Sequence, residues 1–409
     1  MTSGGALTQL VSRGYQDEDL TIADKPATSP FAKVFKRHSP YATETIECVF
    51  DGTVDFGQRL AATVIRRGDL VTGMHMQVTL KKSGNTYFPA EQIVSQLELQ
   101  LGKVPFETIP GDWLRCRQEL FASSDSKAAY ARLTDFVDSE PDGATKTFYL
   151  PLPFFFHERP DLAIPLIAAQ YHDVTVYVNL AKADLVAGID PAYKPEVRLF
   201  VDYAFLGTWE RRVIAKSQHQ LVVEQLQYQV TPCYVTADPV LYKLPIAFNH
   251  PCRWLSWHMG APQLPYVYTG GEAGEPNEAL GPVHQATLLL NGTERFAPRE
   301  GSYFNCYQPY QALKGASQPC AGLYFYSFSR APLDPGASDN GDSTLNFSRV
   351  DAPLFVFTTK AANVAGTSLI AKSTMTTTAA QKLTNITFYT SNYNVLIVKS
   401  GMFGLRYAC

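Results

Sequence analysis

The first half of the chain is dominated by runs in which apolar and polar residues alternate with a period of two. In the run 70–80, every second residue from Met74 onward is apolar and the residues between are polar. Similar alternation occurs over 93–101, 174–180 and 197–205. Successive side chains of a strand point to opposite faces of its sheet, so these runs predict strands with a buried face.

The second half repeats this pattern after a polar and basic stretch at 207–220. Runs suited to strands cover 221–230, 241–248, 254–259, 286–290, 322–328, 354–358 and 385–398. Gly, Pro and Asn residues separate them, which is typical of an all-β protein. We therefore predict an N-terminal arm at 1–30, a first domain at 31–210 and a second at 211–409.

One segment departs from the strand pattern. Trp113, Cys116 and Leu120 recur at helical intervals between residues 111 and 136. This spacing predicts a short helix placed on a loop of the first domain.

Three consecutive aromatic residues, Phe154, Phe155 and Phe156, follow the prolines Pro151 and Pro153. Proline suits the rim of a sheet, because it cannot donate a ladder hydrogen bond. If the aromatic residues continue an extended strand, their side chains alternate. We then expect Phe154 and Phe156 in the first domain's core, and Phe155 directed toward the second domain or a neighbouring subunit.

Composition favours a protein with extensive burial. Charged residues make up 18% of the chain, below the ~25% usual for soluble proteins, while aromatic residues reach 12%. Part of that aromatic surface is expected between subunits. A net charge of −3 argues against direct nucleic-acid binding, which requires clustered Lys and Arg. With neither a signal-peptide pattern nor an 18-residue apolar run, we predict a soluble cytosolic chain.

The seven cysteines contain no C-x-x-C pair, so we predict free thiols in place of a zinc site or disulfide framework. The stretch 366–373 approaches a phosphate-binding loop, but Ala371 stands where the second glycine is needed. His38, His157-Glu158 and His172-Asp173 carry acid/base groups without a catalytic motif, and we interpret these histidines as structural. We expect no cofactor or metal.

Several motifs are similar to those of one family, the major capsid proteins of nucleocytoplasmic large DNA viruses, which have the double jelly-roll fold. The proline-flanked aromatic run, the apolar corner at 164–167 and Gln170-Tyr171-His172 resemble its most characteristic segment. Further similar stretches are GGALTQLVSRGYQD at 4–17, FAKVFKRHSPY at 31–41, Glu210-Arg211-Arg212 at the joint, and Phe248-Asn249-His250-Pro251. The chain departs from the family at Gly341-Asp342-Ser343 and in the Gly- and Pro-rich stretch 260–283.

The resemblance implies two tandem eight-stranded jelly rolls and a structural protein without enzymatic activity. It also implies a homotrimer forming a pseudo-hexagonal capsomer of an icosahedral double-stranded DNA virus shell, assembled in the host cytoplasm and located in the virion. Implied partners are neighbouring capsomers, minor capsid and penton proteins, and an internal membrane reached by the arm. Residues assigned to assembly or packing are Phe154, Phe155, Phe156, Arg211 and Arg212, and those assigned to inner contacts are Gln9, Leu10 and Val11.

Residues alone leave a second class of function open. A cytosolic carbohydrate-binding β-sandwich or a glycosidase would also be rich in Tyr and Trp. The paired carboxylates of a glycosidase are brought together only in space, so sequence spacing does not reveal them.

Overall fold

The computed structural model describes residues 41–84, 88–136, 141–186, 188–236, 239–260, 283–316, 319, 322–329, 332, 344–359 and 381–407. The predicted arm, the stretch 260–283 beyond its first and last residues, and the stretch 366–373 lie outside these ranges. Gln9, Leu10, Val11 and His38 are likewise outside.

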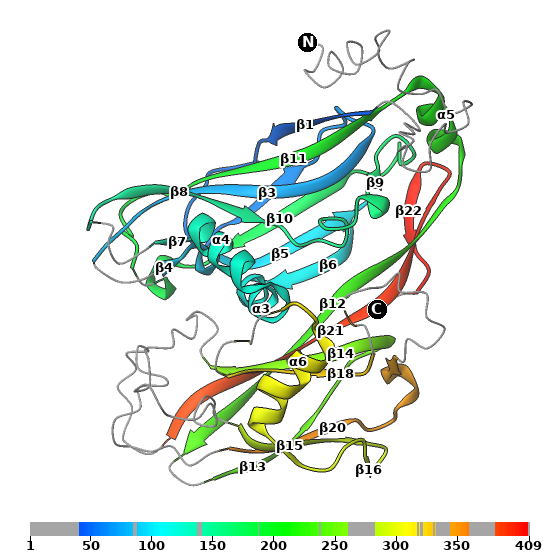
Figure 1. The fold of residues 1–409 in the computed structure, drawn as a ribbon. Coiled ribbons are helices and arrows are strands. Elements are labelled where there is room, and N and C mark those ends of the chain that lie inside the picture. Colours follow the sequence, from blue (N-terminus) through cyan, green and yellow to red (C-terminus); the bar gives the residue numbers. More distant parts are fainter. Residues whose placement is uncertain are drawn as a thin grey trace, which may run out of the picture.

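The first half folds into a five-stranded and a four-stranded antiparallel sheet that face each other (Figure 1). One sheet has the order β1 (Tyr41–Cys48), β11 (Glu196–Leu206), β3 (Leu70–Lys81), β8 (Thr145–Pro151), and the short β9 (Ile164–Pro165) also pairs with β3. The other has the order β2 (Arg59–Thr63), β10 (Val174–Leu180), β5 (Val94–Leu101), β6 (Val104–Pro110).

The second half has the same plan. Its first sheet has the order β12 (His219–Thr236), β21 (Gln381–Lys399), β14 (Pro251–Gly260), β18 (Leu323–Ser327), with β19 (Leu345–Asn346) and β22 (Met402–Leu405) at its borders. Its second has the order β13 (Leu241–Pro245), β20 (Leu354–Thr359), β15 (Val283–Leu290), β16 (Thr293–Glu294), and β17 (Arg299–Glu300) pairs with β15.

The two halves share one topology. When the eight main strands of each half are numbered in chain order, both give sheets with the orders 1-8-3-6 and 2-7-4-5. This is the order of an eight-stranded jelly roll. The predicted all-β class and the two tandem jelly rolls are confirmed. Identical strand order also reveals the internal duplication, which the sequence showed only as repeated spacing.

Helices occupy the connections, and there are more of them than expected. The predicted short helix with Trp113, Cys116 and Leu120 is confirmed as α3 (Gly111–Phe121). A second helix that the spacing did not predict, α4 (Ser124–Thr134), begins after Ser123. Ser123 Oγ accepts a hydrogen bond from the Ser126 amide, which caps the second helix. A small ribbon of β4 (Phe88–Pro89) and β7 (Asp135–Phe136), with η1 (Ala90–Ile93), completes this region.

The joint between the rolls also forms a helix, α5 (Thr208–Lys216). The predicted domain boundary at residue 210 falls inside it and stays a prediction. In the second roll, a π-helix (Tyr303–Tyr307) runs into α6 (Gln308–Ala312). Three single-turn 3₁₀ segments are η2 (Pro160–Leu162), η3 (Ala183–Leu185) and η6 (Phe347–Arg349).

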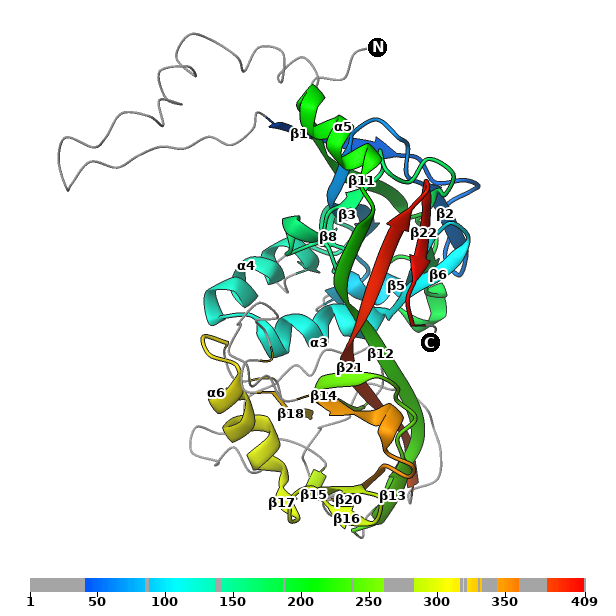
Figure 2. The same cartoon turned by 90° about the vertical axis from the view of Figure 1, so that its right-hand side faces the viewer.

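Strands β12 and β21 are far longer than the others and pair without interruption from His219–Val398 to Thr236–Gln381. They extend beside both rolls as one twisted ribbon (Figure 2). At one end of this ribbon, the turn into β22 contacts the first roll, because Tyr171 donates its amide hydrogen to the Gly401 carbonyl at 2.9 Å. The two rolls are therefore linked by shared strands as well as by side-chain contacts.

Phe154 and Phe156 lie in the first roll's core, as expected, but the alternation that would direct Phe155 away from them is wrong. β8 ends at Pro151, and Phe155 and Phe156 lie in a turn, so strand alternation does not apply to them. All three side chains are buried, with Phe155 9% exposed. Its ring centroid lies 5.0 Å from that of Phe106 and 5.1 Å from that of Phe156. The aromatic triplet belongs to one core.

We expect Phe155→Ala to lower the free energy of unfolding by ~3–5 kcal/mol, as is usual for a buried phenylalanine, and Phe156→Ala to do the same. Tyr149→Ala is the matched control. Tyr149 lies on β8, just before the triplet, and is 45% exposed, so its truncation should lower the free energy of unfolding by less than ~0.5 kcal/mol. Urea unfolding curves measure both. A Phe155→Ala variant as stable as the control would show that this ring contributes nothing to the core.

Candidate assembly core between the two rolls

The contact between the two rolls is the feature of the described residues that a single β-sandwich would not have. In the sheet β12-β21-β14-β18, the strands β21, β14 and β18 are buried on both faces, and their side chains divide between two cores. Residues Leu255, Trp257 and Met259 of β14 face the core of the second roll. Trp254 belongs to the core that continues into the first roll. The same division holds in β18, where Tyr324 and Phe325 face opposite cores.

Helix α3 of the first roll provides the matching aromatic surface. Trp113 stacks on Trp254 with ring centroids 5.5 Å apart and planes inclined by 12°. It also lies 4.7 Å from the ring of Tyr389 on β21. Phe121 meets Trp254 and Phe325 edge-on, at 5.6 and 6.1 Å. Aromatic pairs of this kind contribute ~0.5–1.5 kcal/mol each beyond the burial of their area.

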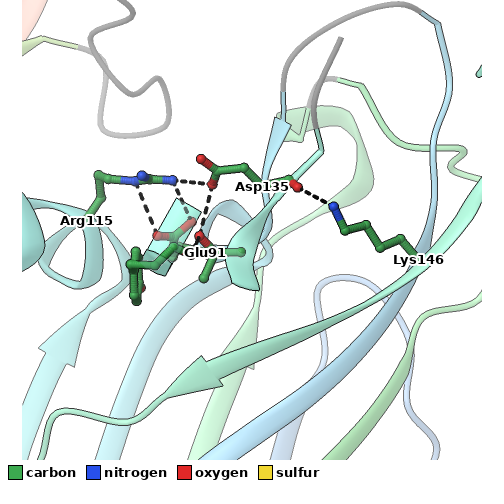
Figure 3. A network of polar contacts seen from close by, with 6 residues as sticks. Glu91, Arg115, Asp135 and Lys146 are labelled. Atoms are coloured by element: carbon green, nitrogen blue, oxygen red, sulfur yellow. Dashed lines mark hydrogen bonds and ion pairs between the residues drawn. The ribbon is translucent and has the colours of Figure 1, made fainter. Parts of the chain in front are cut away.

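A buried polar network holds α3 in place (Figure 3). Arg115 on α3 forms an ion pair with Glu91 of η1, with Nε and Oε1 3.3 Å apart, and a second with Asp135 of β7. Lys146 of β8 donates to the Asp135 backbone carbonyl at 2.8 Å. The Thr134 hydroxyl also donates to the Asp135 carboxylate, at 3.0 Å. Four segments are thereby tied to the helix that carries Trp113.

Electrostatics fit a structural role for this network. Burial raises the pKa of Glu91, and the Arg115 guanidinium opposes that shift. Burial also raises the pKa of the Tyr130 hydroxyl, whose ring lies 5.7 Å from the Arg115 guanidinium carbon. Removing one partner would leave another charge buried without compensation, which is strongly destabilising. The carboxylates of Glu91 and Asp135 both form ion pairs with Arg115.

The edges of two sheets meet where β6 of the first roll passes β12 of the second. Gln225 donates to the Phe106 carbonyl at 2.7 Å, and Asn394 donates to the Gln225 side-chain oxygen at 2.8 Å. The Glu107 carboxyl group accepts from the Leu226 amide at 3.3 Å. Side chains thus cover strand edges that would otherwise be exposed to pairing with other chains.

Residues singled out in the sequence are distributed over this joint. Arg211 forms an ion pair with the buried Asp69, with Nε and Oδ1 2.9 Å apart, whereas Arg212 is exposed. Phe155 approaches the joint through Phe106. His172 accepts a hydrogen bond from the Phe403 amide at its Nδ1 atom, at 3.1 Å, which is a structural role as expected.

The remaining acid/base candidates do not converge. Glu158 pairs with Arg117 at 2.6 Å, and Asp173 with Arg66 at 3.2 Å. Burial lowers the pKa of His157. Within the described ranges no cluster of three or more His, Cys, Asp or Glu residues is arranged to hold a metal ion. Among those same residues no helix is long and apolar enough to cross a membrane.

Sequence reasoning missed the two-sided sheet and the Glu91-Arg115-Asp135 network. Trp254 alternates with Leu255 and Trp257, so both faces of this strand carry large apolar residues. The rest of that second face carries the polar Ser256 and His258, so most of the strand keeps an apolar-polar alternation and only Trp254 marked its second buried face. The ion-pair network had no signal, because its members are separated by 20 or more residues and meet only in the fold.

We expect the joint to lose stability as the pH rises from about 4.5 to about 8. Burial is the main cause that raises the pKa of Glu107 from its ordinary value of 4.5 to about 8, and nearby Glu224 adds to the shift. Burial also raises the pKa of Asp112, beside Trp113, to about 8. Between about pH 4.5 and pH 8, the folded state keeps protons on these carboxyl groups that the unfolded state has lost. Stability should fall with rising pH, by at most ~1.4 kcal/mol per pH unit for each group.

Glu107→Gln should flatten this decline, because glutamine cannot ionise and its amide oxygen can still accept from the Leu226 amide. Glu47→Gln, at an exposed position of β1, is the control and should keep the wild-type slope. Melting temperatures from pH 5 to pH 9 provide the test. If Glu107→Gln and the control show the same slope, the Glu107 carboxyl group does not titrate as its surroundings imply.

Known proteins that are similar to this chain in sequence also share its fold. A family model described as "Major capsid protein N-terminus" matches residues 29–207, and one described as "Large eukaryotic DNA virus major capsid protein" matches residues 210–404. The chain is 37% identical to the major capsid protein of Paramecium bursaria Chlorella virus 1, over 99% of each chain. It is 30% identical to that of Pyramimonas orientalis virus, over 99% of this chain and 100% of the relative.

Solved structures give the same result. A chain of the quasi-atomic model of the PBCV-1 virus capsid superposes with a TM-score of 0.80 at 35% identity, covering 93% of this chain and 100% of that one. The Faustovirus major capsid protein shares the fold at 10% identity, with a TM-score of 0.67 over 96% of this chain and 98% of that one. This chain therefore belongs to the family of major capsid proteins of large eukaryotic DNA viruses.

Proposed function

We propose that this chain, a structural protein of a viral capsid shell, acts as a homotrimer that forms one pseudo-hexagonal capsomer. The duplicated roll carries this proposal. Each subunit contains two rolls of identical strand order. Three subunits around a threefold axis present six similar lobes, so a threefold assembly can occupy a nearly sixfold site and pack edge to edge with its neighbours.

Figure 2 supports a lateral contact face on the trimer. The helices between the fifth and sixth strands of each roll, α3 and α4 in the first and α6 in the second, lie on the same side of the two rolls. On that side Tyr307 is 52% exposed and Tyr310 85% exposed. Tyrosine is enriched at protein interfaces and among the residues that contribute most to binding. We propose this face as a subunit contact.

The capsid role requires no chemistry, and we propose that the protein catalyses none. Its mechanism is the burial of complementary surface between copies. The carbohydrate-binding or glycosidase alternative has no supporting observation in the described residues. Of the buried carboxyl groups, Glu91 and Asp135 are bound to Arg115 and Asp69 to Arg211, which leaves none of these three available as the acid or base of a glycosidase. The fourth, Glu107, accepts a hydrogen bond from the Leu226 amide at the joint.

Further partners follow from the role and remain proposals. Neighbouring capsomers, minor capsid proteins and penton proteins would contact the outer borders of the trimer. Gln9, Leu10 and Val11 of the arm are proposed to contact inner partners or an internal membrane. The net charge of −3 supports a shell that encloses nucleic acid without reading its sequence.

Light scattering on the purified protein should give three times 45.3 kDa, about 136 kDa, because obligate interfaces of this kind bury more than ~2,000 Å². The same preparation in denaturant provides the single-chain reference of 45.3 kDa. A native mass equal to that reference at micromolar concentration would contradict the trimer.

A further inference from the structure

Helix α5 (Thr208–Lys216) carries two exposed apolar side chains, and none of its residues is buried. Trp209 is 72% exposed and Val213 is 44% exposed. Residues four apart lie on one face of a helix, so these two side chains form a continuous apolar surface. The exposed cations Arg212 and Lys216 repeat the same spacing beside it. We call these four residues the α5 face.

The α5 face is held in position by contacts at both ends of the helix. Arg211 is anchored to the carboxylate of Asp69, whose side chain is only 4% exposed. At the other end, the Ser217 hydroxyl donates to the Val213 carbonyl at 2.7 Å, and the His219 ring lies 2.8 Å from the Ile214 carbonyl oxygen. The apolar side chains are therefore presented to solvent by a fixed helix and not by a frayed end.

The N-terminal segment of the chain enters the fold beside this helix. Tyr41, the first described residue, is in register with Leu206, two residues before α5 begins. Figures 1 and 2 both show α5 at the same end of the molecule as the start of β1. Tyr41, to which the preceding residues are joined, therefore lies at the end of β1 next to α5.

Residues 15–24 of that segment, YQDEDLTIAD, have the complementary chemistry. The acidic residues are Asp17, Glu18, Asp19 and Asp24, and the stretch contains no Lys or Arg. Leu20 and Ile22 are apolar. A short sequence combining acids with two apolar side chains matches a face that combines Trp209 and Val213 with two cations.

We propose that residues 15–24 bind the α5 face of the same chain. Sixteen residues lie between Asp24 and Tyr41, and an extended chain over that distance spans about 56 Å, more than enough to return along a nine-residue helix. Tethering raises the local concentration of the segment to the millimolar range, so modest contacts suffice. The proposal does not depend on the trimer.

An anionic membrane is the main alternative occupant. Helices that lie on membranes bury a long apolar face, whereas the α5 face offers two apolar side chains. A tethered acidic segment needs no more surface than this. The arm is therefore the favoured occupant, and lipid is tested as the other outcome.

Tryptophan quenching by acrylamide reports this contact in the full-length protein. Trp113, Trp254 and Trp257 are 4% exposed or less, so Trp209 provides the accessible signal. We expect Trp209 to be protected in the intact chain and its quenching to rise several-fold when residues 1–24 are removed. Salt at 1 M, where the Debye length is ~3 Å, should have a similar effect. Trp209→Phe should abolish the accessible component.

Charge exchange provides the sharper test. Arg212→Glu should expose Trp209, and combining it with Asp17→Lys and Asp19→Lys should restore protection. Lys194→Glu, an exposed position just before β11 and at the opposite end of that strand from α5, should change nothing. Protection should not vary with protein concentration, and native mass measured alongside separates this contact from trimer formation.

Three outcomes would overturn the proposal. The first is equal quenching of Trp209 with and without residues 1–24. The second is protection that appears only as the oligomer forms, which would place the segment on another subunit. The third is protection only on addition of phosphatidylserine vesicles, which would identify the α5 face as a lipid contact.

Discussion

The structure depends on one sheet in which the strands β21, β14 and β18 are buried on both faces. The side chains on one face of the strands β12, β21, β14 and β18 pack in the core of the second roll. Those on the other face pack against the first roll. Trp254 and Trp257, three residues apart on β14, belong to two different cores. Domains of one chain usually move relative to each other unless their interface is large and apolar. Here the interface is an extension of the first roll's core, so we infer that the two rolls behave as one body.

Polar contacts determine how the first roll approaches that sheet. The Glu91-Arg115-Asp135 network fixes α3, and α3 places Trp113 on Trp254. Buried ion pairs contribute little net stability, because desolvation offsets their attraction. Their value here is geometric: the helix that carries the aromatic contact has one position. A capsid subunit benefits from such rigidity, since each tile must present the same borders to all of its neighbours.

Much of the fold could be predicted from the sequence, because alternation directly records a buried and a solvated face. The strands around Met76, Val176 and Leu199 follow from that pattern. Alternation failed for Phe155, since β8 ends at Pro151 and the aromatic residues turn into the core. It could not predict α5, whose residues contact little of the fold, nor the division of Trp254 and Trp257 between two cores. Those features arise from contacts between segments distant in sequence, which no local pattern contains.

The central claim is that the two rolls form one cooperative unit, and amide hydrogen exchange in increasing urea tests it most directly. Strand β3 lies in the first roll and β14 in the shared sheet, so their amides report the opening of each part. If the two rolls share a core, the protected amides of both strands should become exchangeable in one step, with the same free energy of opening. Exchange of β3 and β14 in two well-separated steps would contradict the account and show two rolls that unfold independently.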